Sequence, residues 1–180
     1  MHKLIEWFSK KYSDIKWDMQ RCHHSFANGE VNPYHIEDDC WSHTMLVCKI
    51  CEIREYDVEV QVACLLHDIG KPKAREIKHD SYVFFKGHED ISAQKAKPIL
   101  EDMAKDGLIK EEQIDTILEL ILKHGYLQRK EDVGEVIEEF KGREEFLKLL
   151  VRVSECDDMG RFAKSANRGA ELREQILSKM

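Results

Sequence analysis

The chain has 180 residues and a formal net charge of −7, with 42% apolar and 35% charged residues. This length fits one domain with a hydrophobic core, and this composition excludes an intrinsically disordered chain. The negative charge opposes strong non-specific binding to nucleic acid, and no apolar run approaches the length of a membrane span. Because the first residues also lack a signal-peptide core, we expect a cytoplasmic protein with no membrane partner and six free cysteine thiols.

The first third of the chain predicts a helix, a loop and a second helix. Residues 3–12 have the apolar spacing of a short amphipathic helix. Residues 22–40 are rich in turn-forming residues, which predicts a loop. From Trp41 onward the apolar spacing predicts a helix with His43 on its buried face. A lone CxxC pair in this helix lacks the second ligand pair that a structural zinc site needs.

The rest of the chain continues the helical pattern, with few glycines or prolines to break it. Further helices are predicted over residues 58–68, about 89–105 with Pro98 as a candidate kink, 111–124, 133–140, from about 143 onward and 168–179. Residues 76–87 predict either a short strand or a loop. Since no internal repeat or Pro/Gly/Ser-rich linker divides the chain, we expect residues 1–180 to form a single all-α domain.

Several of these segments carry side chains of the kinds that bind metal ions. Helical spacing turns four of them toward the interior: His43, His67, Asp68 and Asp157. A further helix adds His124, and a loop adds His88. One buried histidine is most often an ordinary core residue, but burying several imidazoles and carboxylates together is costly unless they pair or bind a metal. Imidazole and carboxylate together suit Mn, Fe, Co, Ni or Zn and, less well, Mg.

The same residues lie in a series of short motifs. In chain order the motifs are DDCWSHTMLV, ACLLHDIGKPK, FKGHEDISA, LILKHG and SECDDMGR. This series resembles the HD superfamily of metal-dependent phosphohydrolases, and most of all the HD domain appended to bacterial tRNA nucleotidyltransferases. The resemblance runs from about residue 32 to residue 161 and implies a single-domain HD-type helical bundle. The nucleotidyltransferase half of those enzymes has no counterpart in this chain, so only the phosphohydrolase chemistry carries over.

The resemblance also implies a role for each residue of the motifs. One divalent ion is held by His43, His67, Asp68 and Asp157. Members with two ions add histidines at positions similar to His88 and His124, with Asp68 bridging both ions, so we expect one or two ions per chain.

The last acidic ligand of the resemblance has a neighbour that could replace it. Asp158 is the alternative to Asp157, but the D-x-x-G-R spacing to Gly160 and Arg161 favours Asp157. So does the helical alignment of Asp157 with Leu150, because Asp158 lies about 100° further around the helix.

Two cations of the motifs are candidates for contacts with phosphate, and we expect Asp68 to be catalytic with them. Lys71 is expected to stabilise phosphoryl charge, although a lysine near a helix C-terminus is also favoured for its interaction with the helix dipole. Arg161 could act in the same way, or could pair structurally with an acidic neighbour.

The predicted function is therefore a metal-dependent phosphohydrolase, either a phosphatase or a phosphodiesterase. Its expected partner is a small-molecule nucleotide or an RNA phosphate end, attacked by a metal-activated water. The alternatives are a di-iron oxygenase with the HD fold and a non-catalytic nucleotide-binding module. The sequence leaves open the substrate, the identity of the metal, the oligomeric state and the role of residues 125–142, which are a candidate cover for the site.

Overall fold

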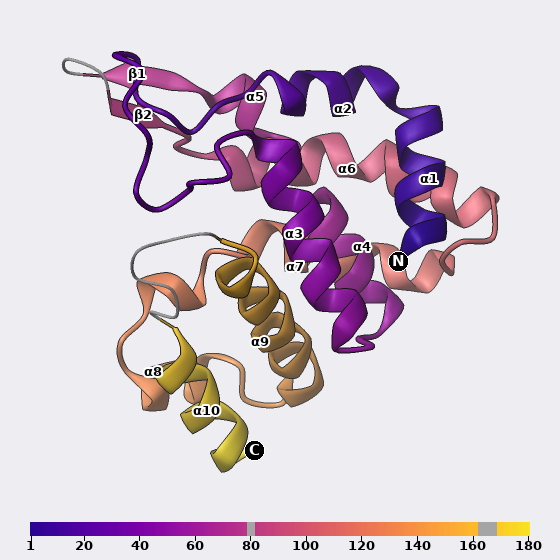
Figure 1. The fold of residues 1–180 in the computed structure, drawn as a ribbon. Coiled ribbons are helices and arrows are strands. Elements are labelled where there is room, and N and C mark those ends of the chain that lie inside the picture. The colour runs from indigo at the N-terminus through magenta and orange to yellow at the C-terminus, as the bar shows by residue number, and fades with distance from the viewer. Residues whose placement is uncertain (79–81, 162–168) are drawn as a thin grey trace.

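The computed structural model describes residues 1–78, 82–161 and 169–180, and over them the protein is a helical bundle with one small sheet (Figure 1). The α-helices are α1 (His2–Lys11), α2 (Ser13–Gln20), α3 (Cys40–Ile53), α4 (Val58–Leu66), α5 (Lys71–Ala74), α6 (His88–Lys105), α7 (Ile114–Lys123), α8 (Val133–Glu139), α9 (Glu144–Met159) and α10 (Ala170–Lys179). Short 3₁₀ turns are η2 (Glu111–Gln113) and η3 (Leu127–Arg129). The predicted all-α fold class is confirmed.

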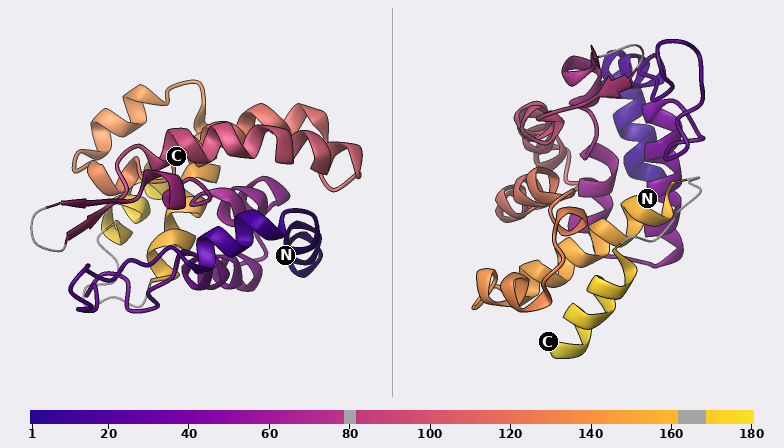
Figure 2. Two further views of the ribbon diagram at one scale, coloured as in Figure 1. Left: turned by 90° about the horizontal axis from the view of Figure 1, so that it is seen from above. Right: turned by 90° about the vertical axis from the view of Figure 1, so that its left-hand side faces the viewer.

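Helix α4 lies at the centre of the bundle, where it packs against α3, α7 and α9 (Figures 1 and 2). Its sequence, VEVQVACLL, is apolar on almost every side, and the side chains from Val62 to Leu66 are fully buried. A helix that is apolar all round is stable only when other elements surround it. This burial is why the residues that follow α4, His67 and Asp68, emerge inside the protein.

The end of α4 differs from the predicted boundary at residue 68, because the helix ends at Leu66. His67 is the C-cap residue, and its Nδ1 donates a hydrogen bond to the Cys64 carbonyl at 2.8 Å. The chain then turns through Gly70, where an added Cβ would lie 2.4 Å from the His88 carbonyl oxygen. Glycine therefore allows the turn after α4 to approach the start of α6, which brings His88 to the site.

The segment predicted as a strand or a loop is a hairpin. Strand β1 (Glu76–Lys78) pairs antiparallel with β2 (Tyr82–Phe84), and Glu76 lies opposite Phe84. Helix α6 follows and continues through Pro98 without interruption, so the candidate kink does not end the helix.

Two segments near the N-terminus complete the fold. Helix α2 was not predicted, because Met19 is its only fully buried side chain and its apolar pattern is weak. Residues 22–40 form a loop as predicted, and its ends are joined by a bridge between His23 and Asp39. Asp39 also caps α3 by accepting a hydrogen bond from the Ser42 backbone N–H at 2.8 Å.

The remaining boundaries follow the predictions closely. The predicted final helix is α10, while residue 168 lies outside the described residues. Among the helices within the described ranges, none combines the length and apolar character that crossing a membrane requires.

Candidate metal centre

All six predicted metal ligands meet at one place in the bundle. His43 comes from the first turn of α3 and Asp157 from the end of α9, while His67 and Asp68 follow α4. His88 begins α6, and His124 follows the end of α7. Five of the six are buried, and the His88 side chain is 16% exposed.

The ligand atoms form two neighbouring groups. His43, His67 and Asp157 make the first, in which the His43 Nε2 lies 3.0 Å and the His67 Nε2 3.9 Å from the Asp157 Oδ1. Asp68, His88 and His124 make the second, in which the two imidazole Nε2 atoms are 3.2 Å apart.

Asp68 lies between the two groups and directs one oxygen toward each. Its Oδ2 is 3.1 Å from the His67 Nε2 and 3.8 Å from the His43 Nε2. Its Oδ1 is 3.3 Å from the His88 Nε2 and 3.8 Å from the His124 Nε2. A single carboxylate can therefore serve both groups, which is the arrangement expected of a bridging ligand.

Each of the four imidazoles is held through its Nδ1. Three of them donate to the backbone carbonyl three residues earlier: His67 to Cys64 at 2.8 Å, His88 to Phe85 at 2.8 Å and His124 to Ile121 at 2.7 Å. In a neutral imidazole, donation by Nδ1 leaves Nε2 as the nitrogen with a lone pair. Fixing the tautomer in this way is the usual means of orienting a metal-binding histidine.

His43 lies inside a helix, where the backbone carbonyls are already engaged in helical hydrogen bonds. Its Nδ1 is therefore held by a side chain and not by a carbonyl. Its Nδ1 is 2.9 Å from the Glu37 Oε1. All four Nε2 atoms are thus turned to the two ligand groups, although one imidazole is held by a carboxylate and three by carbonyls.

The buried atoms that lack hydrogen bonds test whether these residues fit a metal ion. Within the described residues, the His67 Nε2 and both Asp68 carboxylate oxygens are buried without a hydrogen bond, although the Asp68 Oδ2 forms an ion pair with the Lys71 Nζ at 2.7 Å. Leaving such groups unsatisfied costs about 1–3 kcal/mol each, and more for a charged group. A divalent cation would satisfy all three atoms, and the imidazole and carboxylate donors suit such an ion. The site therefore fits the predicted metal.

Electrostatics keep both buried carboxylates of the site ionised. Burial alone would raise the pKa of Asp68, but the charges of His67 and Lys71 outweigh it and hold that pKa well below its usual range. Burial likewise opposes ionisation of Asp157, while the charge of Arg161 and a hydrogen bond from His43 lower its pKa well below normal. Anionic carboxylates are the form that binds a metal.

The pKa values of the two histidines His124 and His43 shift in opposite directions. Burial lowers the pKa of His124 to about 4, and the neighbouring charge of His67 adds to the shift. Burial also acts to lower the pKa of His43, but hydrogen bonds to Asp157 and Glu37 outweigh it and raise that pKa.

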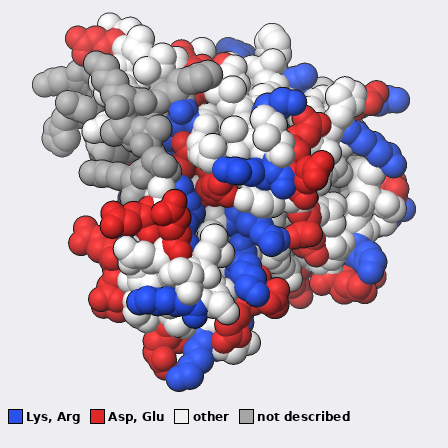
Figure 3. Space-filling model, turned by 60° about the horizontal axis from the view of Figure 1, so that its bottom comes forward, with Lys and Arg blue, Asp and Glu red and all other residues white. Residues whose placement is uncertain are grey.

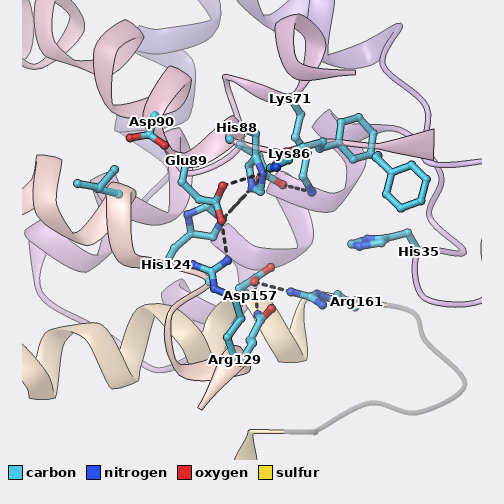
Figure 4. Close-up of a pocket in the computed structure, with 17 residues that line it drawn as sticks. His35, Lys71, Lys86, His88, Glu89, Asp90, His124, Arg129, Asp157 and Arg161 are labelled. Atoms are coloured by element: carbon cyan, nitrogen blue, oxygen red, sulfur yellow. Dashed lines mark hydrogen bonds and ion pairs between the residues drawn. The ribbon is translucent and has the colours of Figure 1, made fainter. Parts of the chain in front are cut away.

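The centre opens into a cavity of about 740 Å³, which is lined by residues from both ligand groups and by four cationic side chains (Figure 4). These are Lys71, Lys86, Arg129 and Arg161. Phe84, Phe85 and Leu122 add an apolar part to the wall. The cavity thus combines the candidate metal ligands with positive charge and aromatic surface.

Lys71 is at the predicted place but already carries an ion pair. Its side chain is nearly buried, and its Nζ lies 2.7 Å from the Asp68 Oδ2 and 3.1 Å from the His24 Nε2. Burial acts to lower the pKa of Lys71, but Asp68 outweighs burial and raises it. The lysine is therefore buried in an ion pair with Asp68 and is not a solvent-exposed residue at a helix end.

The two aspartates at the end of α9, Asp157 and Asp158, have different arginine partners. The Arg161 Nη2 lies 2.5 Å from the Asp157 Oδ2, so the predicted structural ion pair is present, and Arg161 also lines the cavity. Asp158 instead pairs with buried Arg173. This division favours Asp157 as the ligand, and the assignment remains a prediction.

Several residues at the site were missed from the sequence. Glu37 and His24 lie in the loop before α3, where no periodicity indicates which way a side chain points. Arg173 lies on a helix whose sequence is mostly polar, so its burial was not expected. The loop residue His35 also lines the cavity. Gln128 donates to the Asp157 Oδ2 at 2.6 Å, and a side-chain amide in a loop gives no sequence signal for such a contact.

The segment over residues 125–142 contributes to the cavity through its first residues. Gly125, Gln128 and Arg129 line the wall, and Arg129 donates to the Glu89 Oε1 at 2.7 Å. Helix α8, in the second half of the segment, instead contacts α10. Only the part around η3 therefore faces the centre.

A helical bundle that directs four imidazoles and two carboxylates into one cationic cavity has the arrangement of a metal-dependent hydrolase. The family model of the HD domain matches residues 40–176, so this chain belongs to the HD domain family. Members of this family are typically metal-dependent hydrolases, and they bind divalent metals.

Among curated proteins, the chain is similar to two that are named Multifunctional CCA protein. They come from Burkholderia orbicola (strain MC0-3) and Burkholderia multivorans (strain ATCC 17616 / 249). Each is 31% identical over 101 residues, which make up 56% of this chain and 23% of the relative. The similarity thus spans less than a quarter of the relatives' length. No solved structure matches the chain significantly.

Proposed function

We propose that this protein hydrolyses phosphate esters of nucleotides or of RNA ends, using a water molecule activated by divalent metal. The observation that carries the proposal is the position of Asp68. It directs one carboxylate oxygen toward each of two histidine-containing groups. Lys71 pairs with the Oδ2, and the buried Oδ1 has no hydrogen bond within the described residues. An anionic carboxylate buried in this way is costly unless cations share it.

The proposed ligands of each ion correspond to the two groups of ligand atoms described above. His43, His67 and Asp157 would hold one ion, His88 and His124 a second, and Asp68 both. A bound divalent ion supplies a water molecule whose pKa falls from 15.7 to about 7, and so provides hydroxide at neutral pH. The protein's own contribution is to fix the imidazole tautomers through the Nδ1 hydrogen bonds and to keep both carboxylates ionised.

The cationic side chains of the cavity would bind the phosphoryl group. In phosphoryl transfer the charge spreads over the non-bridging oxygens, so preorganised cations stabilise it without reorganising. Lys71 and Arg161 are both held beside the ligand carboxylates by ion pairs, which places their charge at the base of the cavity. Lys86 and Arg129 line the outer wall.

The size and surroundings of the cavity support a small anionic substrate. A volume of about 740 Å³ is in the range of sites for small molecules and cofactors, and Phe84 and Phe85 offer aromatic surface to a base. In Figure 3, Lys and Arg side chains lie across the middle of one face, with Asp and Glu on both sides. Such interleaved charge suits a local phosphate contact better than a long nucleic-acid track.

The test is a panel of phosphate esters with Mn, Co, Ni or Mg. It would contain 2′,3′-cyclic AMP, 2′-AMP, 3′-AMP, 5′-dAMP, dATP and an RNA with a cyclic-phosphate end. We expect release of phosphate, or opening of the cyclic ester, for one class of substrate. The activity should disappear with a chelator and in Asp68→Ala, and should return when metal is added back to the wild type.

Binding of metal is measured in parallel by calorimetry with Mn²⁺. Turnover of no ester by a protein that binds Mn²⁺ would overturn the proposal. Oxygen consumption by an iron-loaded sample, without ester hydrolysis, would replace it with the oxygenase alternative.

A further inference from the structure

One carboxylate outside the predicted ligand set connects the metal centre with the cavity wall. Glu37 lies in the loop before α3, and its side chain is 3% exposed. Its Oε1 is 2.9 Å from the His43 Nδ1 and 3.0 Å from the His35 Nδ1. The same oxygen thus holds a candidate metal ligand on one side and a loop histidine on the other.

His43 is the one ligand histidine that needs such a partner. His67, His88 and His124 lie at helix ends or starts, where a nearby carbonyl accepts from Nδ1. A carboxylate holds an imidazole more strongly than a neutral carbonyl does, because the hydrogen bond is charge-assisted. The orientation and basicity of His43 therefore depend on Glu37 in a way that those of the other three histidines do not.

The second hydrogen bond of Glu37 fixes His35 in the wall of the cavity. Figure 4 shows the His35 ring directed into the cavity, on the same side as Arg161. The ring stacks on His24, with centroids 4.0 Å apart and planes within 8°. Nδ1 is held by Glu37 and one ring face by His24, while Nε2 has no hydrogen bond to the described residues and is the ring nitrogen that we assign to a ligand.

His24 is itself fixed by groups of the site. Its Nδ1 lies 2.6 Å from the Asp38 carbonyl oxygen, and its Nε2 lies 3.1 Å from the Lys71 Nζ. Because the lysine ammonium only donates, these contacts require Nδ1–H to donate to the carbonyl and Nε2 to accept. The histidine stack is thereby tied to Lys71 and does not rest on loop packing alone.

We propose that Glu37 is a positioning residue that orients His43 for metal binding and orients His35 to contact the substrate. The second half of this statement rests on the proposed phosphohydrolase function, while the first half concerns metal binding alone. No covalent role is assigned to either side chain.

The experiment measures Mn²⁺ binding by calorimetry and hydrolysis of the best substrate of the panel. Glu37→Ala removes the hydrogen bonds to His43 and His35 and should weaken the Mn²⁺ Kd by about 10- to 100-fold, the usual cost of losing a partner of a metal-binding histidine. Glu37→Gln keeps the accepting oxygen and loses only the charge, so its Kd should lie between those of wild type and Glu37→Ala.

His35→Asn separates the two halves of the proposal. The asparagine amide can replace the Nδ1–H donor to Glu37 but removes the ring edge that faces the cavity. We expect an unchanged Mn²⁺ Kd together with a raised KM or a lowered kcat. The ¹⁵N shifts of the His43 ring report its tautomer directly and should change in Glu37→Ala but not in His35→Asn.

The neighbouring residue provides a matched control. Asp38 also holds a histidine, with its Oδ2 2.8 Å from the His23 Nδ1, but His23 is exposed and outside the site. Asp38 has a φ of 65°, a conformation that asparagine tolerates well. Asp38→Asn therefore tests the general effect of disturbing this loop and should leave the Mn²⁺ Kd unchanged.

The outcomes separate this inference from the proposed function. If wild type and Glu37→Ala bind Mn²⁺ equally and show the same His43 shifts, the inference is overturned while the proposed function stands. Equal losses in Asp38→Asn and Glu37→Ala would also overturn it, since the effect would then be one of loop folding. A wild type that binds no divalent metal would overturn both.

Discussion

Among the groups of metal-ligand side chains within the described residues, two draw on α3, on α9 and on α4 or its C-cap residue. The first contains His43, His67 and Asp157. The second consists of three cysteines, Cys51, Cys64 and Cys156, whose sulfur atoms lie within 4.8 Å of one another. Cys64 lies three residues before His67, and Cys156 immediately precedes Asp157. The same helix packing has thus created two sets of potential ligands.

The clusters differ in what satisfies their polar atoms. The three thiols hydrogen-bond to one another, and all three residues are fully buried. A buried thiol behaves as a small apolar side chain, so this cluster is complete as core packing. In the histidine and aspartate cluster, by contrast, the His67 Nε2 is buried without a hydrogen bond within the described residues, and Asp157 lines the cationic cavity. Proximity of ligand types is therefore a weaker sign of a metal site than unsatisfied atoms beside a cavity.

The largest difference in activity between the two clusters is expected for substitutions in α4 and in the turn after it. Asp68→Ala removes the carboxylate shared by both ligand groups, and we expect hydrolysis to fall by about 10³-fold, since metal ions supply several kcal/mol of transition-state stabilisation. Cys64→Ala, about one turn earlier in the same segment, is the matched control and should keep its activity. Initial rates at saturating Mn²⁺ check this, and equal losses in the two variants would contradict the comparison.

Substitutions of the two aspartates at the end of α9 should have different effects, one on stability and the other on metal binding. Asp158→Ala removes the carboxylate that pairs with the buried Arg173 and should cost about 3–5 kcal/mol of unfolding free energy, the usual cost of breaking a buried ion pair. Asp157→Asn keeps the volume and should instead weaken Mn²⁺ binding. Urea unfolding and calorimetry measure the two effects. Stronger loss of metal affinity in Asp158→Ala than in Asp157→Asn would make Asp158 the ligand.

The pH dependence of stability should also report on the histidine cluster. Burial lowers the pKa values of His35 and His124 from 6.5 to about 4. Between these pH values the unfolded chain binds protons that the folded protein does not, so stability falls as pH falls. Each histidine should remove about 1.4 kcal/mol per pH unit in this window.

The stabilising protonation of His43 does not cancel this loss, because a raised pKa contributes stability that is already complete below 6.5. Urea unfolding of metal-free protein between pH 7 and pH 4.5 measures the slope, and His35→Asn should make it shallower. A flat profile would mean that these rings titrate in the folded protein as they do in water.

The smallest effect is expected from the cysteine cluster. Cys156→Ala removes one sulfur from a packed core and should cost about 1 kcal/mol of unfolding free energy, with no change in activity. Elemental analysis of metal-loaded samples gives the second measurement, because the number of ions per chain should equal that of wild type. A lower number would mean that the thiols hold an ion after all.

Much of this protein was determined by the sequence itself. Helical periodicity placed His43 and Asp157 on buried faces, and the apolar run before His67 indicated a central helix. The order of motifs indicated the family, which the match over residues 40–176 confirms. These signals are local, since the period of a helix and the spacing within a motif depend only on residues a few positions apart.

Only the tertiary structure decided how these residues face one another. The sequence could not show that Asp68 directs one oxygen toward each ligand group, that Glu37 holds His43, or that Asp158 pairs with Arg173. It also gave no sign that Cys51, Cys64 and Cys156 meet, because they are far apart along the chain. Such contacts depend on the packing of distant helices and on loop conformations that lack periodicity. The sequence thus determined which residues lie inside, and packing decided which of them act together.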